Sequence, residues 1–119
     1  MAEHNALGKK GEELAVNFLI HKGYNILERN YRYLKSEVDI IARNEDIVIA
    51  VEVKTRSTPE FGNPQDFVKP KQMQSLVRVM DHYITEHDLN VEVRFDIVAI
   101  IKNKQGTNIE HLESAFYHF

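Results

Sequence analysis

Apolar residues in the middle of the chain gather in two runs that are rich in β-branched side chains. The runs lie within residues 37–54, and the polar residues Asn44, Glu45 and Asp46 separate them. Two such runs around a short polar segment predict a β-hairpin. A two-residue turn at Glu45 and Asp46 would pair Asn44 with Ile47, and this pairing would set the register of both strands.

The rest of the hydrophobic pattern predicts two helices and two further strands. The first helix is ended by Gly23, and Pro70 is well suited to be the first residue of the second. The expected elements are helices over 8–22 and from residue 70, strands over 24–31 and 91–101, a turn over 103–106, and a short strand or helix over 108–119. The order is therefore helix, three strands, helix, strand and short C-terminal element. It predicts an α/β fold in which helices flank a mixed central sheet.

Apolar residues at helical spacing define a buried face on each helix. They are Leu14, Ala15, Val16, Phe18, Leu19 and Ile20 in the first helix, and Met73, Leu76, Val77, Met80, Tyr83 and Ile84 in the second. Glu12 falls within the first of these faces, whereas Glu13 falls outside it. A buried carboxylate needs a partner, and Gly8 and Gly11 would let another backbone approach. Alternatively, Glu12 complements the dipole of the helix.

The hairpin register places charged residues opposite one another. Asp39 would face Glu52, and Glu37 would face Lys54, so that all four side chains project from one face of the sheet. That face continues with Ile41, Ala50 and Val48, while Val38, Ile40, Val51 and Val53 project from the other face. An apolar continuation of this kind must be covered by another part of the chain.

Opposed carboxylates in such a place would require a cation. Their Cβ atoms would lie about 5 Å apart, and at an effective dielectric constant of 20 the repulsion is about 3 kcal/mol. Lys54 supplies one positive charge, and a divalent ion such as Mg²⁺ or Mn²⁺, which prefers oxygen ligands, would supply more. The alternative is an ordinary salt bridge between Glu37 and Lys54, with Asp39 and Glu52 exposed to solvent.

Composition narrows the class of protein. The 119 residues are 43% hydrophobic and 28% charged, which is typical of one soluble globular domain covering residues 1–119. The net charge of −3 excludes a strongly basic chain but not local basic patches. There is no cysteine, no signal-peptide pattern and no apolar run of membrane length, so we expect a cytoplasmic protein without a membrane span.

Two segments outside the hairpin, around the first strand and before the second helix, are candidates for binding. Arg29, Arg32 and Lys35 lie among Tyr31 and Tyr33, a mixture compatible with contact to a nucleic-acid backbone and also common on plain surfaces. Residues 55–69 are expected to form a long loop, in which Pro59, Gly62 and Pro64 favour turns and Phe61 and Phe67 anchor the loop to the core. Lys69 lies next to the second helix, whose outer face carries Lys71, Gln74 and Arg78. Such a loop is typical of a lid or a binding segment.

Near the C-terminus, two further features are expected to be structural. Asp96 lies inside an apolar strand, where pairing with Arg94 is favoured over catalysis. The aromatic residues Phe116, Tyr117 and Phe119 are expected to pack on the core or on a second subunit.

Short segments spread over nearly the whole chain resemble the YraN family of bacterial proteins. They are Gly-Lys-Lys-Gly-Glu at 8–12, Gly23-Tyr24, Arg29-Asn30, Ser-Glu-Val-Asp at 36–39, Val-Glu-Val-Lys-Thr-Arg at 51–56, Phe61-Gly62, Lys71 and Arg94-Phe-Asp. Ser36 stands where the family pattern usually has glycine. That family resembles the restriction-endonuclease-like PD-(D/E)XK superfamily, and most of all the archaeal-type Holliday junction resolvases.

The resemblance implies a restriction-endonuclease-like fold and a nuclease site. A helix glutamate, a strand aspartate and a Glu-x-Lys sequence on the next strand build the metal site of such enzymes. Carried over by position, Glu12, Asp39 and Glu52 would bind Mg²⁺ or Mn²⁺, and Lys54 would be the catalytic lysine. Lys71 stands where related nucleases place a further polar residue. The residues and the resemblance therefore select the same site.

We therefore expect a metal-dependent nuclease that acts on DNA, on branched structures or on intermediates of repair and recombination. Arg32, Arg56, Lys69 and Lys71 would contact the phosphate backbone, which favours recognition of shape over recognition of sequence. Cutting two strands with one small domain would require a symmetric homodimer. Two alternatives remain: a non-catalytic module that binds nucleic acid or protein, and a purely structural hairpin with the long loop as the interaction surface.

Overall fold

The computed structural model describes residues 2–58 and 68–115, with side chains described from Leu7 onward. Its elements are α1 (Ala2–His21), β1 (Asn25–Tyr33), β2 (Ser36–Asn44), β3 (Ile47–Arg56), α2 (Pro70–Glu86), β4 (Glu92–Asn103) and β5 (Gly106–Leu112). The predicted order of elements is confirmed, and the last element is a strand. The loop anchors Phe61 and Phe67, the turn formers Pro59, Gly62 and Pro64, and the aromatic residues Phe116, Tyr117 and Phe119 lie outside the described residues.

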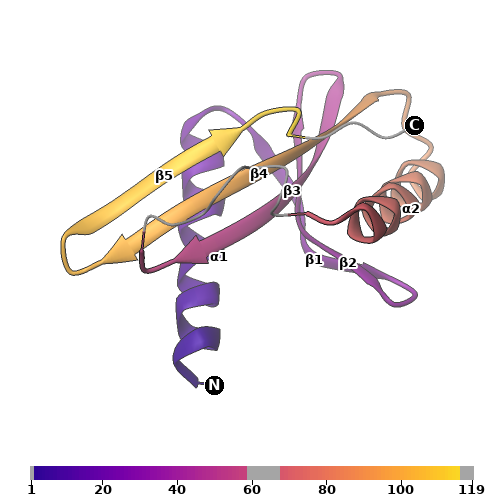
Figure 1. Ribbon diagram of the computed structural model, residues 1–119. Helices are drawn as coiled ribbons and strands as arrows, with labels where there is room; N and C mark the ends of the chain where they lie inside the picture. Colours follow the sequence, from indigo (N-terminus) through magenta and orange to yellow (C-terminus); the bar gives the residue numbers. More distant parts are fainter. Residues whose placement is uncertain (1, 59–67, 116–119) are drawn as a thin grey trace.

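The strands form one mixed five-stranded sheet in the order β1-β2-β3-β4-β5 (Figure 1). Neighbouring strands are antiparallel except β3 and β4, which are parallel and are joined through α2. A parallel connection requires a crossover long enough to return to the same edge of the sheet, and the helix supplies it. The prediction of an α/β fold with a mixed central sheet and flanking helices is confirmed.

Each helix packs on its own layer of sheet residues. The core on the α1 side contains Ala15, Val16, Leu19, Ile40, Ala42, Ile49 and Val51. The core on the α2 side contains Ile41, Val48, Ala50, Leu76, Val79, Met80 and Tyr83. Strand side chains alternate between faces, so β3 serves both layers and must be apolar along most of its length. The sheet is therefore covered on both sides near its middle.

The first helix is longer than predicted, and its buried face is narrower. It begins at Ala2, because Gly8 does not interrupt a run of otherwise good helix formers. It ends as expected before Gly23, whose φ of 93° suits glycine. Ile20, expected on the buried face, is 51% exposed, whereas Leu19 is fully buried. Ile20 therefore lies beyond the edge of the contact between helix and sheet.

The predicted hairpin register is confirmed from Asn44–Ile47 to Ile40–Val51. One prediction about its faces is wrong, because Val38 packs in the α2-side core and not with Ile40 on the α1 side. Val38 pairs with Tyr31 of β1, which packs on the same side. The alternation of β2 side chains between the two faces is thus interrupted between Ile40 and Val38, just beyond the last β2–β3 pair.

The second helix begins at Pro70 as predicted. Leu76, Met80 and Tyr83 are buried as expected, together with Val79, while Met73, Val77 and Ile84 are partly buried against the same core. No helix in the described part of the chain is both long enough and apolar enough to cross a membrane.

Candidate functional site

Asp39 and Glu52 each bind the backbone of the opposite strand. The N–H of Asp39 donates to Glu52 Oε2 at 3.3 Å, and the N–H of Val53 donates to Asp39 Oδ2 at 2.8 Å. The last β2–β3 pair is Ile40–Val51. Asp39 and Glu52 are the next residues on the two strands, so they lie opposite each other just beyond that pair. Their carboxylates thus take over hydrogen bonds where the β2–β3 ladder ends, and this holds both side chains in fixed orientations.

The other oxygen of Glu52 is held by the second helix. Gln72 Nε2 donates to Glu52 Oε1 at 2.8 Å, and Glu52 is only 5% exposed. Gln72 is not among the residues that the sequence pattern selected. A signal was present, since Gln72 precedes the buried Leu76 by four residues and therefore shares its helix face.

Glu12 approaches the same place from the first helix. A Cβ atom on Gly11 would overlap the side chain of Thr55 on β3, so glycine is what allows α1 to lie this close to the strand. The expectation of a close approach is confirmed at Gly11 and wrong at Gly8, beside which there is open space. Glu13 points away and pairs with Arg29 at 2.7 Å, as its place outside the buried face predicted.

These side chains line one hollow of about 350 Å³, which we call the carboxylate hollow. Its walls are formed by Leu7, Gly8 and Glu12 of α1, Asp39 of β2, residues 52–56 of β3, and Gln72 of α2. All four predicted catalytic residues, Glu12, Asp39, Glu52 and Lys54, therefore meet in one hollow, and the predicted DNA-contacting residue Arg56 joins them.

Burial and mutual repulsion make ionisation of the acids in the carboxylate hollow unfavourable. Burial, and then the charge of Asp39, raise the pKa of Glu52 to about 8. Burial also raises the pKa of Asp39, although hydrogen bonds from Val53 and Glu52 and the charge of Lys54 oppose the rise. The pKa of Glu12 is raised by burial and by the charge of Asp39. Since α1 begins at Ala2, Glu12 lies well beyond its first turn, so the alternative that Glu12 complements the helix dipole is wrong.

Glu37 does not join this group in the way that its register predicted. Its Oε2 accepts a hydrogen bond from Arg32 Nε at 2.8 Å, and no ion pair links Glu37 to Lys54, both of which are described. The alternative of an ordinary Glu37–Lys54 salt bridge is therefore wrong. The β2–β3 pairing ends before these two residues would meet, whereas the β1–β2 pairing continues and sets Glu37 directly opposite Arg32.

A second hollow, of about 470 Å³, lies beside the first, and we call it the basic hollow. It is lined by Lys35, Ser36 and Glu37 at the β1–β2 end and by Lys69, Lys71, Gln72, Ser75 and Leu76 at the start of α2. Gln72 lines both hollows. Of the four residues predicted to contact DNA, Lys69 and Lys71 thus lie here, Arg56 lies in the carboxylate hollow, and Arg32 is exposed and pairs with Glu37.

Comparison with known proteins places the chain in a family. The model of the Uncharacterised protein family UPF0102 matches residues 11–100. The chain belongs to this family. Similar relatives are UPF0102 proteins of Christiangramia forsetii (70% identical, covering all of both chains), Flavobacterium psychrophilum (56%, covering all of both chains) and Phocaeicola vulgatus (44%, covering 98% of this chain and 97% of the relative). The resemblance to the YraN family, which is UPF0102, is confirmed.

The donor groups in this UPF0102 chain suit a hard divalent cation. Asp39 and Glu52 offer carboxylate oxygens, and burial together with the charge of Asp39 raises the pKa of Glu52 despite the nearby charge of Lys54. Within residues 2–58 and 68–115, no set of three or more His, Asp or Glu side chains is already arranged as a metal site. Two carboxylates would therefore form the core of the site, with Glu12 on its wall.

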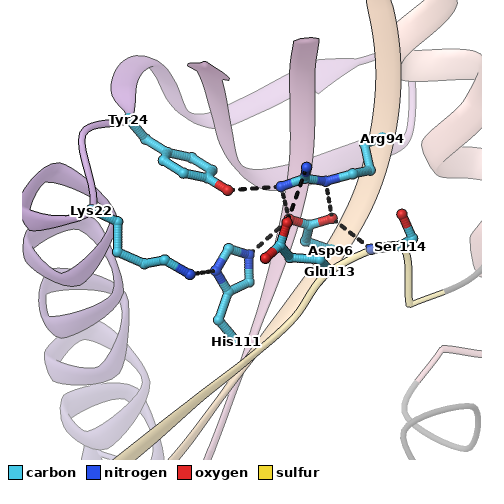
Figure 2. A network of polar contacts seen from close by, with 7 residues as sticks. All are labelled: Lys22, Tyr24, Arg94, Asp96, His111, Glu113 and Ser114. Carbon is cyan, nitrogen blue, oxygen red and sulfur yellow. Dashed lines mark hydrogen bonds and ion pairs between the residues drawn. The ribbon is translucent and has the colours of Figure 1, made fainter. Parts of the chain in front are cut away.

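A separate polar cluster of the UPF0102 chain surrounds the fully buried Asp96 (Figure 2). Arg94 donates two hydrogen bonds to its carboxylate, His111 Nε2 lies 2.7 Å from Oδ2, and the N–H of Ser114 donates to Oδ1. Burial opposes ionisation of Asp96, but these hydrogen bonds outweigh it and hold the pKa below its ordinary value. The predicted pairing with Arg94 is confirmed.

The same cluster extends to the end of α1. Arg94 Nη2 donates to the hydroxyl of Tyr24, and Lys22 Nζ lies 2.8 Å from His111 Nδ1. Figure 2 shows these groups linking the end of the first helix to β4 and the segment after β5. No buried polar side-chain atom in the described part of the chain is without a hydrogen bond. A buried and fully satisfied network of this kind is structural.

Proposed function

We propose that this UPF0102 protein is a restriction-endonuclease-like, metal-dependent nuclease that hydrolyses phosphodiester bonds in DNA. The observation that supports this most strongly is the buried Glu52 carboxylate beside Asp39, in a hollow that also contains Glu12 and Lys54. Placing two carboxylates together is destabilising by itself. An enzyme recovers that cost when a cation binds, whereas a purely structural hairpin does not.

Asp39 and Glu52 would hold the Mg²⁺ or Mn²⁺ ion, with Glu12 bound to it directly or through water. The ion would supply a bound water of lowered pKa and positive charge beside the phosphate. Lys54 would orient the attacking water and stabilise negative charge on the phosphate oxygens. The water oxygen would form a bond to phosphorus and release a proton to bulk water, while the bond to the leaving sugar oxygen breaks and that oxygen takes up a proton from bulk water. Gln72 would keep Glu52 in place throughout.

DNA is the proposed substrate because the positive side chains lie next to the carboxylates. Arg56 borders the carboxylate hollow, and Lys69 and Lys71 border the basic hollow that adjoins it. Contacts of this kind, with Arg32 at the periphery, bind phosphates without reading bases. We therefore propose recognition of DNA structure, with branched DNA and repair intermediates as substrates. Cleavage of both strands would use a homodimer.

A second candidate is a DNA-binding module that does not cleave. The specific observation in its favour is that the described residues contain no ready set of three metal ligands. Binding would then depend on the basic residues alone and would be insensitive to the carboxylates.

The test is cleavage of a four-way junction, a flap and a linear duplex in the presence of Mn²⁺. Glu12→Ala, Asp39→Asn and Lys54→Ala should each reduce cleavage by at least about 100-fold, in line with the loss of a catalytic group. Glu13→Ala is the matched control, because Glu13 adjoins Glu12 but points away from the hollow toward Arg29, and it should cleave as the wild type does.

Calorimetry with Mn²⁺ alone separates the candidates further. Heat of binding that disappears in Asp39→Asn and Glu52→Gln agrees with the nuclease proposal. Wild-type protein that binds DNA but neither binds Mn²⁺ nor cleaves would establish the non-catalytic module instead.

A further inference from the structure

The turn between β1 and β2 carries an exposed leucine in an unfavourable backbone conformation. Leu34 and Lys35 form the turn, which Tyr33 and Ser36 close as a pair. The Leu34 side chain is 76% exposed, and its φ is 58°. Glycine, asparagine or aspartate is the ordinary choice for such a position. A leucine there has both a strained backbone and an exposed apolar side chain. Strained backbone positions are concentrated at functional sites.

The strands that carry this turn are braced against the second helix. The ring of Tyr33 stacks on His82, with 3.7 Å between ring centroids, and the ring of Tyr31 meets Tyr83 edge to face at 5.1 Å. Tyr31 and Tyr33 both pack against the α2-side core. Leu34 is thus an exposed apolar side chain at the end of a supported hairpin.

Positive charge surrounds the base of the turn. Lys35 lines the basic hollow together with Lys69 and Lys71. The acidic residue of that hollow, Glu37, is paired with Arg32. A DNA strand lying in the basic hollow would pass Gln72 and reach Glu52 and Asp39, because Gln72 borders both hollows. The charge around the turn therefore suits a polyanion.

We propose that Leu34 is a wedge that packs against the exposed face of a base pair at a branch point or strand end. This inference rests on the proposed function in taking DNA as the ligand, and it names the structural feature of the DNA that is recognised. Lys35, Lys69 and Lys71 hold the phosphates of the strand that leads from this point toward the carboxylate hollow.

The physical basis for selectivity is the balance between apolar burial and base stacking. Proteins insert leucine and similar side chains between base steps, and they must then compensate for the loss of stacking. One leucine buries too little surface to open an intact step by itself. At a junction or end, the stack is already interrupted, so the side chain is buried without this cost. Leu34 therefore favours branched DNA over a continuous duplex.

The experiment compares binding of a four-way junction with binding of a linear duplex of the same base composition, measured by fluorescence anisotropy without divalent metal. Leu34→Ala and Leu34→Gly should each lower the ratio of junction to duplex affinity by about tenfold, the effect expected for loss of a buried leucine. Ile20→Ala is the matched control. Leu34 and Ile20 are the large exposed apolar residues of the described chain, and Ile20 lies on α1, away from both hollows.

A second readout reports on the bases themselves. Wild-type protein should raise the fluorescence of 2-aminopurine placed beside the branch point, and both Leu34 variants should not. The glycine variant also removes the backbone strain, so its melting temperature should equal or exceed that of the wild type. A loss of junction preference in a fully folded variant then reflects the missing side chain.

An unchanged affinity ratio in both Leu34 variants would overturn the wedge, and it would leave the nuclease proposal intact if junction cleavage still required Asp39. If the Leu34 variants lose the preference for the junction and the wild-type protein cleaves none of the DNA in Mn²⁺, the wedge is supported and the nuclease proposal is overturned. Failure of wild-type protein to bind any of the DNA would overturn the wedge, whereas the nuclease proposal is decided separately by the cleavage assay in Mn²⁺.

Discussion

The backbone N–H of Asp39 donates a hydrogen bond to the carboxylate of Glu52, the residue that faces it across the hairpin. The arrangement orients two acids toward one hollow at the point where the strands cease to pair. Burial raises the pKa of both carboxyl groups, and the charge of Asp39 raises that of Glu52 further, so their ionised forms destabilise the folded protein when no cation is bound.

Glu52→Gln should stabilise the metal-free protein at neutral and alkaline pH. The pKa of Glu52 is raised from 4.5 to about 8, so the stability that this group contributes below pH 4.5 is lost as the pH rises through about 8. Glutamine does not ionise. Its advantage in free energy of unfolding should therefore be absent at pH 4 and grow steadily as the pH rises to 8.5. Urea unfolding at several pH values in EDTA measures it, and an advantage that does not vary with pH would contradict ionisation of Glu52 as its cause.

Gln72→Ala should impair DNA cleavage more than it impairs folding. The variant removes the donor to Glu52 Oε1 and frees that side chain to move. We expect cleavage in Mn²⁺ to fall by about tenfold, equivalent to one hydrogen bond to a charged group. Gln74→Ala is the matched control, because Gln74 is exposed on the same helix. Equal activity of the two variants would mean that Gln72 does not position Glu52.

Gly11→Ala and Gly8→Ala should have opposite effects on stability. Both residues lie within α1, where alanine is preferred to glycine by about 1 kcal/mol. At Gly8 the added methyl group meets open space, so the melting temperature should rise. At Gly11 it meets Thr55, so α1 must shift away from β3 and the melting temperature should fall. The double variant Gly11→Ala/Thr55→Ala, which removes the threonine hydroxyl nearest to the added methyl group, should recover part of the loss.

Asp96→Asn should destabilise the protein by about 3 kcal/mol near pH 7, since it leaves the partly buried Arg94 with the exposed Glu113 as its charged partner in place of the fully buried Asp96. The pKa of Asp96 is held below its ordinary value of 3.8. Its stabilising effect is therefore present above that value and is lost as the pH falls through the folded-state pKa. The difference between variant and wild type in thermal unfolding should be nearly constant from pH 5 to 8 and shrink below pH 4.

Local sequence patterns were sufficient for the elements and for the hairpin. The register of β2 and β3 follows from a two-residue turn at Glu45 and Asp46, which leaves one pairing for residues 40–44 and 47–51. The start of α2 at Pro70 follows from the fixed backbone angle of proline. The convergence of Asp39 and Glu52 was predictable for the same reason, because residues that face each other in a set register are neighbours.

Beyond the end of that ladder, neighbouring elements decide where side chains point, and the sequence pattern does not reveal them. Glu37 pairs with Arg32 because β1 remains paired with β2 after β3 has separated, and Val38 lies on the α2 side together with its β1 partner Tyr31. Gln72 reaches Glu52 only because the crossover places α2 over that end of the sheet.

The sequence by itself thus determined the order of the elements, the hairpin register and the three acids and the lysine of the carboxylate hollow, since each depends on short-range periodicity and turn geometry. Tertiary structure alone decided which partners those residues have, where the basic hollow lies, and that Leu34 stands exposed. These depend on contacts between segments far apart in the chain, whose free energies no local pattern encodes.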